Sequence, residues 1–115
     1  MRNKQLLEQR ADALVEGDVI KIAKAFGFVV ATVDLEGKCS GLIMVNMARR
    51  KILGIKAKRL IVVDRHLYYD DSRLLVARAL VLYDLCGHKD VFARMFKRKG
   101  KNFETITLNE QSRRR

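Results

Sequence analysis

Two histidines, two cysteines and several clusters of cations are the side chains of this sequence that could take part in chemistry. His66 and His88 are the only histidines, and with Cys39, Cys86 or Asp64 they could form a site only by long-range assembly. Their spacing matches no zinc-binding or disulfide pattern. The sequence therefore predicts reduced thiols, packing or surface roles for both histidines, and no metal or other cofactor.

A strongly apolar segment from Leu74 to Leu85 is the element that must position any site. Only Arg78 and Asp84 interrupt it, so the helix predicted here must be covered by protein on most sides. Gly87 is placed to form its C-terminal cap, and a polar triplet precedes it as candidate N-terminal caps. That triplet is Asp70, Asp71 and Ser72.

The other predicted elements follow from changes of hydrophobic period along the chain. Two helices are expected at the N-terminus, then three strands, and after the central helix a shorter helix over residues 88–100. The first two strands are expected to pair as a hairpin, and segment 47–58 fits either a strand extension or a helical turn. The predicted helices span about 3–16 and 18–26, and the strands span 28–33, 41–46 and 59–64. The fold class is thus α+β, with a small three-stranded sheet packed on the long central helix.

Length and composition favour one domain over residues 1–115. The chain is 49% hydrophobic, which argues against intrinsic disorder. The core is expected at about 13–96, and residues 101–115 are expected to be an edge strand or a flexible basic tail. The longest apolar runs are shorter than the ~20 residues that span a bilayer, and the N-terminus is too polar for a secretory signal. We therefore expect a cytoplasmic protein without a membrane partner.

The net charge of +11 is the strongest compositional signal. Basic residues concentrate in an acid-free stretch between Gly37 and Val63 and again near residue 98. Such clusters attract nucleic acid or an acidic protein surface. The candidate partner surface consists of Arg49, Arg50, Lys51, Lys56, Lys58, Arg59, Lys97, Arg98 and Lys99.

The order of the elements, and three stretches within them, resembles the ImmA/IrrE type of small zinc metallopeptidase domain. The stretch from Asp18 to Gly41 resembles the family's opening helix, strand and glycine turn, and IVVD resembles its strand before the main helix. Val76–Leu85 falls where the family has a helix of the form Ile-Ala-His-Glu-Leu-Gly-His, and Phe92-Ala93 resembles a pair in its following helix. The resemblance implies a minimal zincin-like fold.

The catalytic residues of that family are replaced in this sequence. Arg78, Ala79 and Leu82 stand where the family has its first zinc-binding histidine, its general base and its second histidine. A charged arginine cannot ligate zinc, alanine has no base and leucine has no donor atom. The resemblance therefore implies a domain that has lost zinc and peptidase activity.

Two interpretations of Arg78 remain open. Its stem can cover neighbouring leucines while its guanidinium reaches solvent. Alternatively, the guanidinium replaces the metal charge and pairs with an acid at the strand-to-helix turn, namely Asp64, Asp70 or Asp71.

The function expected from these observations is that of a catalytically inactive ImmA/IrrE-like domain. It would bind or regulate a protein, such as a repressor or another regulator in a phage or other mobile element, a context that comes from the resemblance alone. The alternative is a small basic protein that binds nucleic acid.

Overall fold

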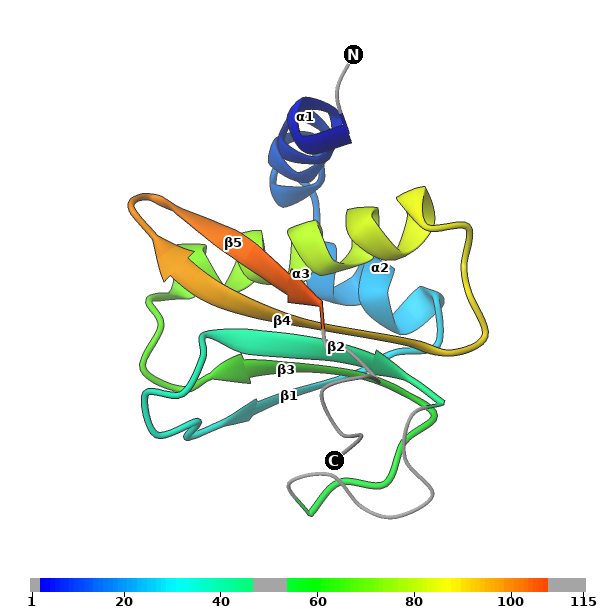
Figure 1. Ribbon diagram of the computed structural model, residues 1–115, viewed down its shortest axis with the longest axis vertical. Coiled ribbons are helices and arrows are strands. Elements are labelled where there is room, and N and C mark those ends of the chain that lie inside the picture. Colours follow the sequence, from blue (N-terminus) through cyan, green and yellow to red (C-terminus); the bar gives the residue numbers. More distant parts are fainter. Residues whose placement is uncertain (1–2, 47–53, 108–115) are drawn as a thin grey trace, which may run out of the picture.

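The computed structural model describes residues 3–46 and 54–107, and it has an α+β fold with three helices and a five-stranded mixed sheet (Figure 1). The helices are α1 (Asn3–Val15), α2 (Val19–Ala25) and α3 (Tyr69–Leu85). The strands are β1 (Val29–Val33), β2 (Gly41–Val45), β3 (Arg59–Asp64), β4 (Phe92–Lys99) and β5 (Asn102–Thr107). None of these helices combines the length and apolar composition needed to cross a membrane.

The sheet order is β1-β3-β2-β4-β5, which corrects two features of the predicted sheet. Strands β1 and β2 do not pair as a hairpin, because β3 lies between them, parallel to β1 and antiparallel to β2. The strands expected over residues 41–46 and 59–64 are observed as β2, which ends one residue earlier, and β3. The three predicted strands are therefore present, but they form one side of a larger sheet.

The segment after α3 is strand β4, and the prediction of a helix over residues 88–100 is wrong. Val91, Phe92, Met95 and Phe96 have a spacing that fits one helix face, yet Phe92 and Phe96 also lie on one face of a strand. The following run, 102–107, pairs with β4 through the two-residue turn Gly100–Lys101, where Gly100 has a φ of +62°. Such turns favour β-hairpins, so local turn geometry and pairing with β2 decide the outcome.

The main core lies between the sheet and its helices. Leu75, Val76 and Leu80 of α3 pack with sheet residues such as Ile43 and Phe96, and α1 and α2 pack against α3 in turn. Figure 1 shows the helices gathered over one side of the sheet, with the β4–β5 hairpin rising past α3. The core extends beyond residues 13–96, since Leu7 and Phe103 are buried in it. A smaller cluster around Leu35, Leu60 and Val62 lies on the opposite face.

The two ends of α3 are capped differently from one another. Gly87 has a φ of +80°, and the Gly87 and His88 amides donate to the Asp84 and Tyr83 carbonyls, a Schellman cap. This confirms the predicted role of Gly87. At the other end the N-cap residue is Tyr68, whose side chain makes no capping bond. Asp70 and Asp71 lie inside the first turn and contribute charge rather than caps, and Ser72 donates to the Tyr69 carbonyl.

Gly41 of β2 packs tightly against Leu75 of α3 and has no room for a side chain. A Cβ atom at this position would lie 2.5 Å from the Val62 carbonyl oxygen and 2.8 Å from both Cδ atoms of Leu75. We predict that Gly41→Ala destabilises the protein by about 1 to 3 kcal/mol, because backbone and a buried leucine must both shift. Chemical denaturation measures this, with Gly17→Ala as the control, since its new methyl group would lie at an ordinary contact distance of 3.6 Å from the Leu14 carbonyl oxygen. Equal stability of the two variants would contradict the prediction.

Candidate functional site

The three positions at which the resembled family carries its zinc motif lie on α3 toward its middle. Arg78 and Ala79 are buried, with Arg78 only 3% exposed, and Leu82 is half-buried. Because i and i+4 positions share a helix face, Arg78 and Leu82 face the same side. That side is turned toward β5, where both residues line one cavity. The sequence placed these residues on one buried helix correctly but did not predict what they face.

Arg78 fastens the β4–β5 hairpin to α3 through two hydrogen bonds. Its Nη1 donates to Asn102 Oδ1 and its Nη2 donates to the Phe103 carbonyl, each at 2.9 Å. A buried guanidinium is costly to desolvate unless its donors are met, and bonds from a charged donor are stronger than neutral ones. We call this contact the Arg78 clasp. It connects the centre of the helix to an edge strand of the sheet.

Both interpretations of Arg78 made from the sequence are wrong. Its guanidinium does not reach solvent, and no contact between described residues joins it to Asp64, Asp70 or Asp71. Asp71 instead accepts from Arg98 of β4 at 2.9 Å, and Asp64 accepts from the Leu35 amide at 3.0 Å. The physical reason is distance along the helix, since Arg78 lies two turns beyond Asp71. The observed acceptors belong to β5, which was predicted as an edge strand or a flexible tail and was not placed against the helix. Its hairpin partner β4 was predicted as a helix, so the contact was not foreseen.

A cavity of about 660 Å³ lies beside the Arg78 clasp, between α1, α3 and β5. Leucines and Phe103 form much of its wall, and Lys99 and Glu104 bring charges of opposite sign. The lining residues are Leu7, Arg78, Leu82, Leu85, Cys86, Lys99, Asn102, Phe103, Glu104 and Thr105.

A second groove, of about 400 Å³, lies between the three helices and is more apolar. Leu14, Ile22 and Leu80 contribute to it, and Phe26, 44% exposed, stands at its side. We call this surface the helical groove. One ion pair joins α1 to α3 there, because Arg10 Nη2 lies 2.5 Å from Asp84 Oδ2.

Asp84 also binds His88, whose Nε2 lies 2.7 Å from Asp84 Oδ1. The hydrogen bond from Arg10, with help from His88, holds the pKa of Asp84 below its usual value. The carboxylate is thus committed to two cationic or donor groups. The imidazole of His88 stacks on Tyr83 and contacts the ring of Phe26 edge-on. His88 therefore belongs to the packing around the helical groove, as the sequence predicted.

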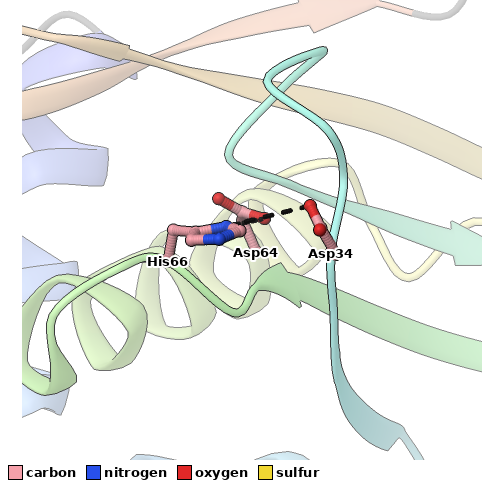
Figure 2. Close-up of side chains that lie close together, drawn as sticks. All are labelled: Asp34, Asp64 and His66. Carbon is pink, nitrogen blue, oxygen red and sulfur yellow. Dashed lines mark ion pairs between the residues drawn. The ribbon is translucent and has the colours of Figure 1, made fainter.

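A third cluster forms where the parallel strands β1 and β3 end side by side. Asp34 follows β1, Asp64 ends β3, and His66 lies two residues later (Figure 2). His66 Nδ1 is 3.5 Å from Asp64 Oδ1 and 3.8 Å from Asp34 Oδ1. The hydrogen bond from the Leu35 amide is the main cause that lowers the pKa of Asp64, and the neighbouring His66 lowers it further. The sequence named Asp64 and His66 as members of a site that only long-range assembly could form, and Asp64 also as a candidate partner of Arg78. It missed Asp34, whose proximity depends on the parallel pairing of β1 with β3.

The candidate basic surface does not form one continuous patch among the described residues. Arg49, Arg50 and Lys51 lie outside the described residues. Lys58 and Arg59 stand at the beginning of β3, whereas Lys97–Lys99 stand at the far end of β4, which runs in the same direction as β3. About 20 Å of strand separates the two groups. Arg59 also donates to the Phe26 carbonyl, and Arg98 is held by Asp71.

No family model, curated protein or solved structure matches the chain significantly.

Proposed function

We propose that this chain is a non-catalytic domain of the ImmA/IrrE type that binds a protein partner. The observation that carries the proposal is the Arg78 clasp. At the place where the family's helix presents a histidine and a glutamate, this helix presents a buried guanidinium committed to Asn102 and Phe103, and a buried Ala79. These residues stabilise the fold and offer neither a metal ligand nor a general base.

We keep the zincin-like fold as part of the proposal because the central strand and helix follow the expected order. A strand, β3, leads directly into the buried helix α3, as it does in the family the sequence resembles. The five-stranded sheet and the β4–β5 hairpin are additions to the three-stranded arrangement that was expected. They support a change of role for the helix, because the hairpin covers the side on which Arg78 and Leu82 lie.

The helical groove favours a protein over a nucleic acid as the partner. Its walls are mostly apolar, and among the described residues that line it the single cation, Arg10, is already paired with Asp84. Phosphate binding instead requires several cations that can be neutralised together. Among the described residues, the basic groups are split between two ends of the sheet and are partly engaged within the chain. An apolar side chain from a protein partner therefore suits the mostly apolar groove better than a phosphate does.

Photo-crosslinking from the helical groove tests this proposal. With p-benzoylphenylalanine in place of Phe26, we expect one defined protein to be crosslinked in the native host. The same probe at Val91, also exposed and apolar at 57%, is the matched control outside the groove. Equal crosslinking from both positions, or from neither, would contradict a partner site in the groove. The resemblance suggests that this partner belongs to the regulators of phages or other mobile elements, and the sequence composition leads us to propose that both proteins are cytoplasmic.

Nucleic-acid binding remains the second candidate because of the net charge of +11. Titration of labelled duplex and single-stranded DNA and RNA across a range of salt concentrations separates the two. A protein that neutralises several phosphates loses affinity steeply as salt rises. We expect only weak binding that disappears near physiological salt. Tight binding at physiological salt, reduced by reversing Lys97 and Lys99 to glutamate, would favour the nucleic-acid alternative.

A further inference from the structure

We infer that Asp34, Asp64 and His66 form a binding site for one divalent transition-metal ion, with Zn²⁺ as the representative. The three donors come from two segments that are 30 residues apart in sequence, so no spacing motif announces them. The site is separate from α3 and from the lost zinc motif. It also does not depend on the proposed protein-binding function, because no residue is shared with the helical groove.

Sheet topology brings the donors together. Val33 pairs with Asp64 in the parallel register of β1 and β3, so both strands end at the same edge of the sheet. The Arg65 amide donates to the Val33 carbonyl and the Leu67 amide donates to the Asp64 carbonyl, which turns the chain back at His66. As Figure 2 shows, the imidazole then lies against both carboxylates at this edge.

The distances fit an ion better than direct contacts between the side chains. Hydrogen bonds from an imidazole to a carboxylate are about 2.7 to 3.2 Å long, and the observed separations of 3.5 and 3.8 Å exceed that range. Two ligands of a tetrahedral zinc ion, with bonds of about 2.1 Å, lie roughly 3.4 Å apart. All three donor atoms lie within 4.8 Å of one another. An ion can therefore contact all three after small side-chain adjustments.

The second pair of histidine and aspartate in the chain provides an internal contrast. His88 and Asp84 are in direct contact at 2.7 Å, and the remaining oxygen of Asp84 is held by Arg10. Both oxygens of Asp84 therefore already have partners, and the direct contact with His88 leaves no space for an ion between them. At the proposed site, two carboxylates approach one imidazole, no described cation pairs with either carboxylate except His66, and their mutual repulsion favours a bound cation.

Backbone amides orient the carboxylates. The Leu35 amide donates to Asp64 Oδ1 at 3.0 Å, and the Glu36 amide donates to Asp34 Oδ1 at 2.8 Å. In both residues the oxygen that accepts the amide is the Oδ1 that lies near His66, so a metal would use a remaining lone pair of that oxygen or the free Oδ2. One imidazole with two carboxylates suits Zn²⁺ or Mn²⁺, and the exposed side of the site leaves coordination positions for water or for a ligand from a partner.

Isothermal titration of the intact protein with Zn²⁺ alone, in a non-coordinating buffer, tests the inference. We expect one equivalent to bind, and we expect His66→Ala and Asp34→Asn to weaken that affinity at least about tenfold. His88→Ala is the matched control and should leave the affinity unchanged. Asparagine at position 34 keeps the acceptor for the Glu36 amide, so a loss of affinity reports the loss of a charged ligand rather than of the turn.

The position of the ion is checked independently with Mn²⁺, which broadens NMR signals near its binding site. We expect the amide signals of Leu35 and His66 to broaden before those of Asp84 and His88, in the wild type only. Three results would overturn the inference: no binding of either ion at millimolar concentration, equal affinity of wild type and His66→Ala, or broadening centred on α3.

Discussion

Replacing Leu75 with alanine should lower the free energy of unfolding by about 2 to 5 kcal/mol. Leu75 is fully buried in α3, and its methyl groups lie against Gly41 of β2. Gly41 has no side chain that could fill the cavity that alanine at position 75 would leave. The loss therefore includes both the transfer energy of the side chain and the energy of an unfilled cavity.

Chemical denaturation monitored by far-UV circular dichroism measures this loss. Val91→Ala, at an exposed position that also loses apolar atoms, is the control and should change stability by less than about 0.5 kcal/mol. A cost below about 1 kcal/mol for Leu75→Ala would show that α3 is not the centre of the core.

Removing the Arg78 clasp should have the other large effect. Arg78→Ala deletes two charge-assisted hydrogen bonds and strands the Phe103 carbonyl, which is bonded inside the protein. Bonds to charged groups contribute about 1.5 to 3 kcal/mol each, so we expect a total loss of about 3 kcal/mol or more. This exceeds the cost of breaking an exposed ion pair such as Arg98 with Asp71.

Two further variants separate the clasp from simple packing. Arg78→Met restores apolar volume but no donors, so it should recover only part of the stability. Asn102→Ala removes one acceptor and should cost less than Arg78→Ala. Amide hydrogen exchange adds a local readout, because β5 should lose protection in the Arg78 variants before α2 does. If β5 exchanges at the same rate in all of them, the guanidinium does not hold the hairpin.

The elements with strong local signals could be predicted from the sequence. Local patterns correctly predicted α3 from its apolar run, its end from Gly87, and β1 and β3 from their β-branched residues. For β4 the signal was ambiguous, since its four apolar residues fit a helix face as well as a strand. Pairing with β2 and the tight turn at Gly100 settled it, and both depend on residues outside the segment. The place of β3 between β1 and β2 was likewise a property of the whole sheet.

The candidate sites were less accessible to sequence reasoning than the fold was. The helical period identified Arg78 as a charged residue on an apolar face. Its partners lie on β5, which was expected to be an edge strand or a flexible tail and was not placed beside the helix. Asp34, Asp64 and His66 meet because two strands are parallel and in register, and no local pattern encodes that pairing. Turn signals offered the one missed clue, because Gly100 and Lys101 separate two runs of alternating residues.

Peptide hydrolysis by the zinc-loaded protein is the most direct test of the claim that α3 serves structure rather than catalysis. Homogeneous protein is incubated with Zn²⁺ and an unfolded protein substrate, and new amino termini are counted over time. We predict a rate equal to that of the metal solution alone, and the same rate for Leu82→Ala. Cleavage that requires the protein, stops with a chelator and is abolished by substitutions on α3 that leave the fold intact would contradict the account.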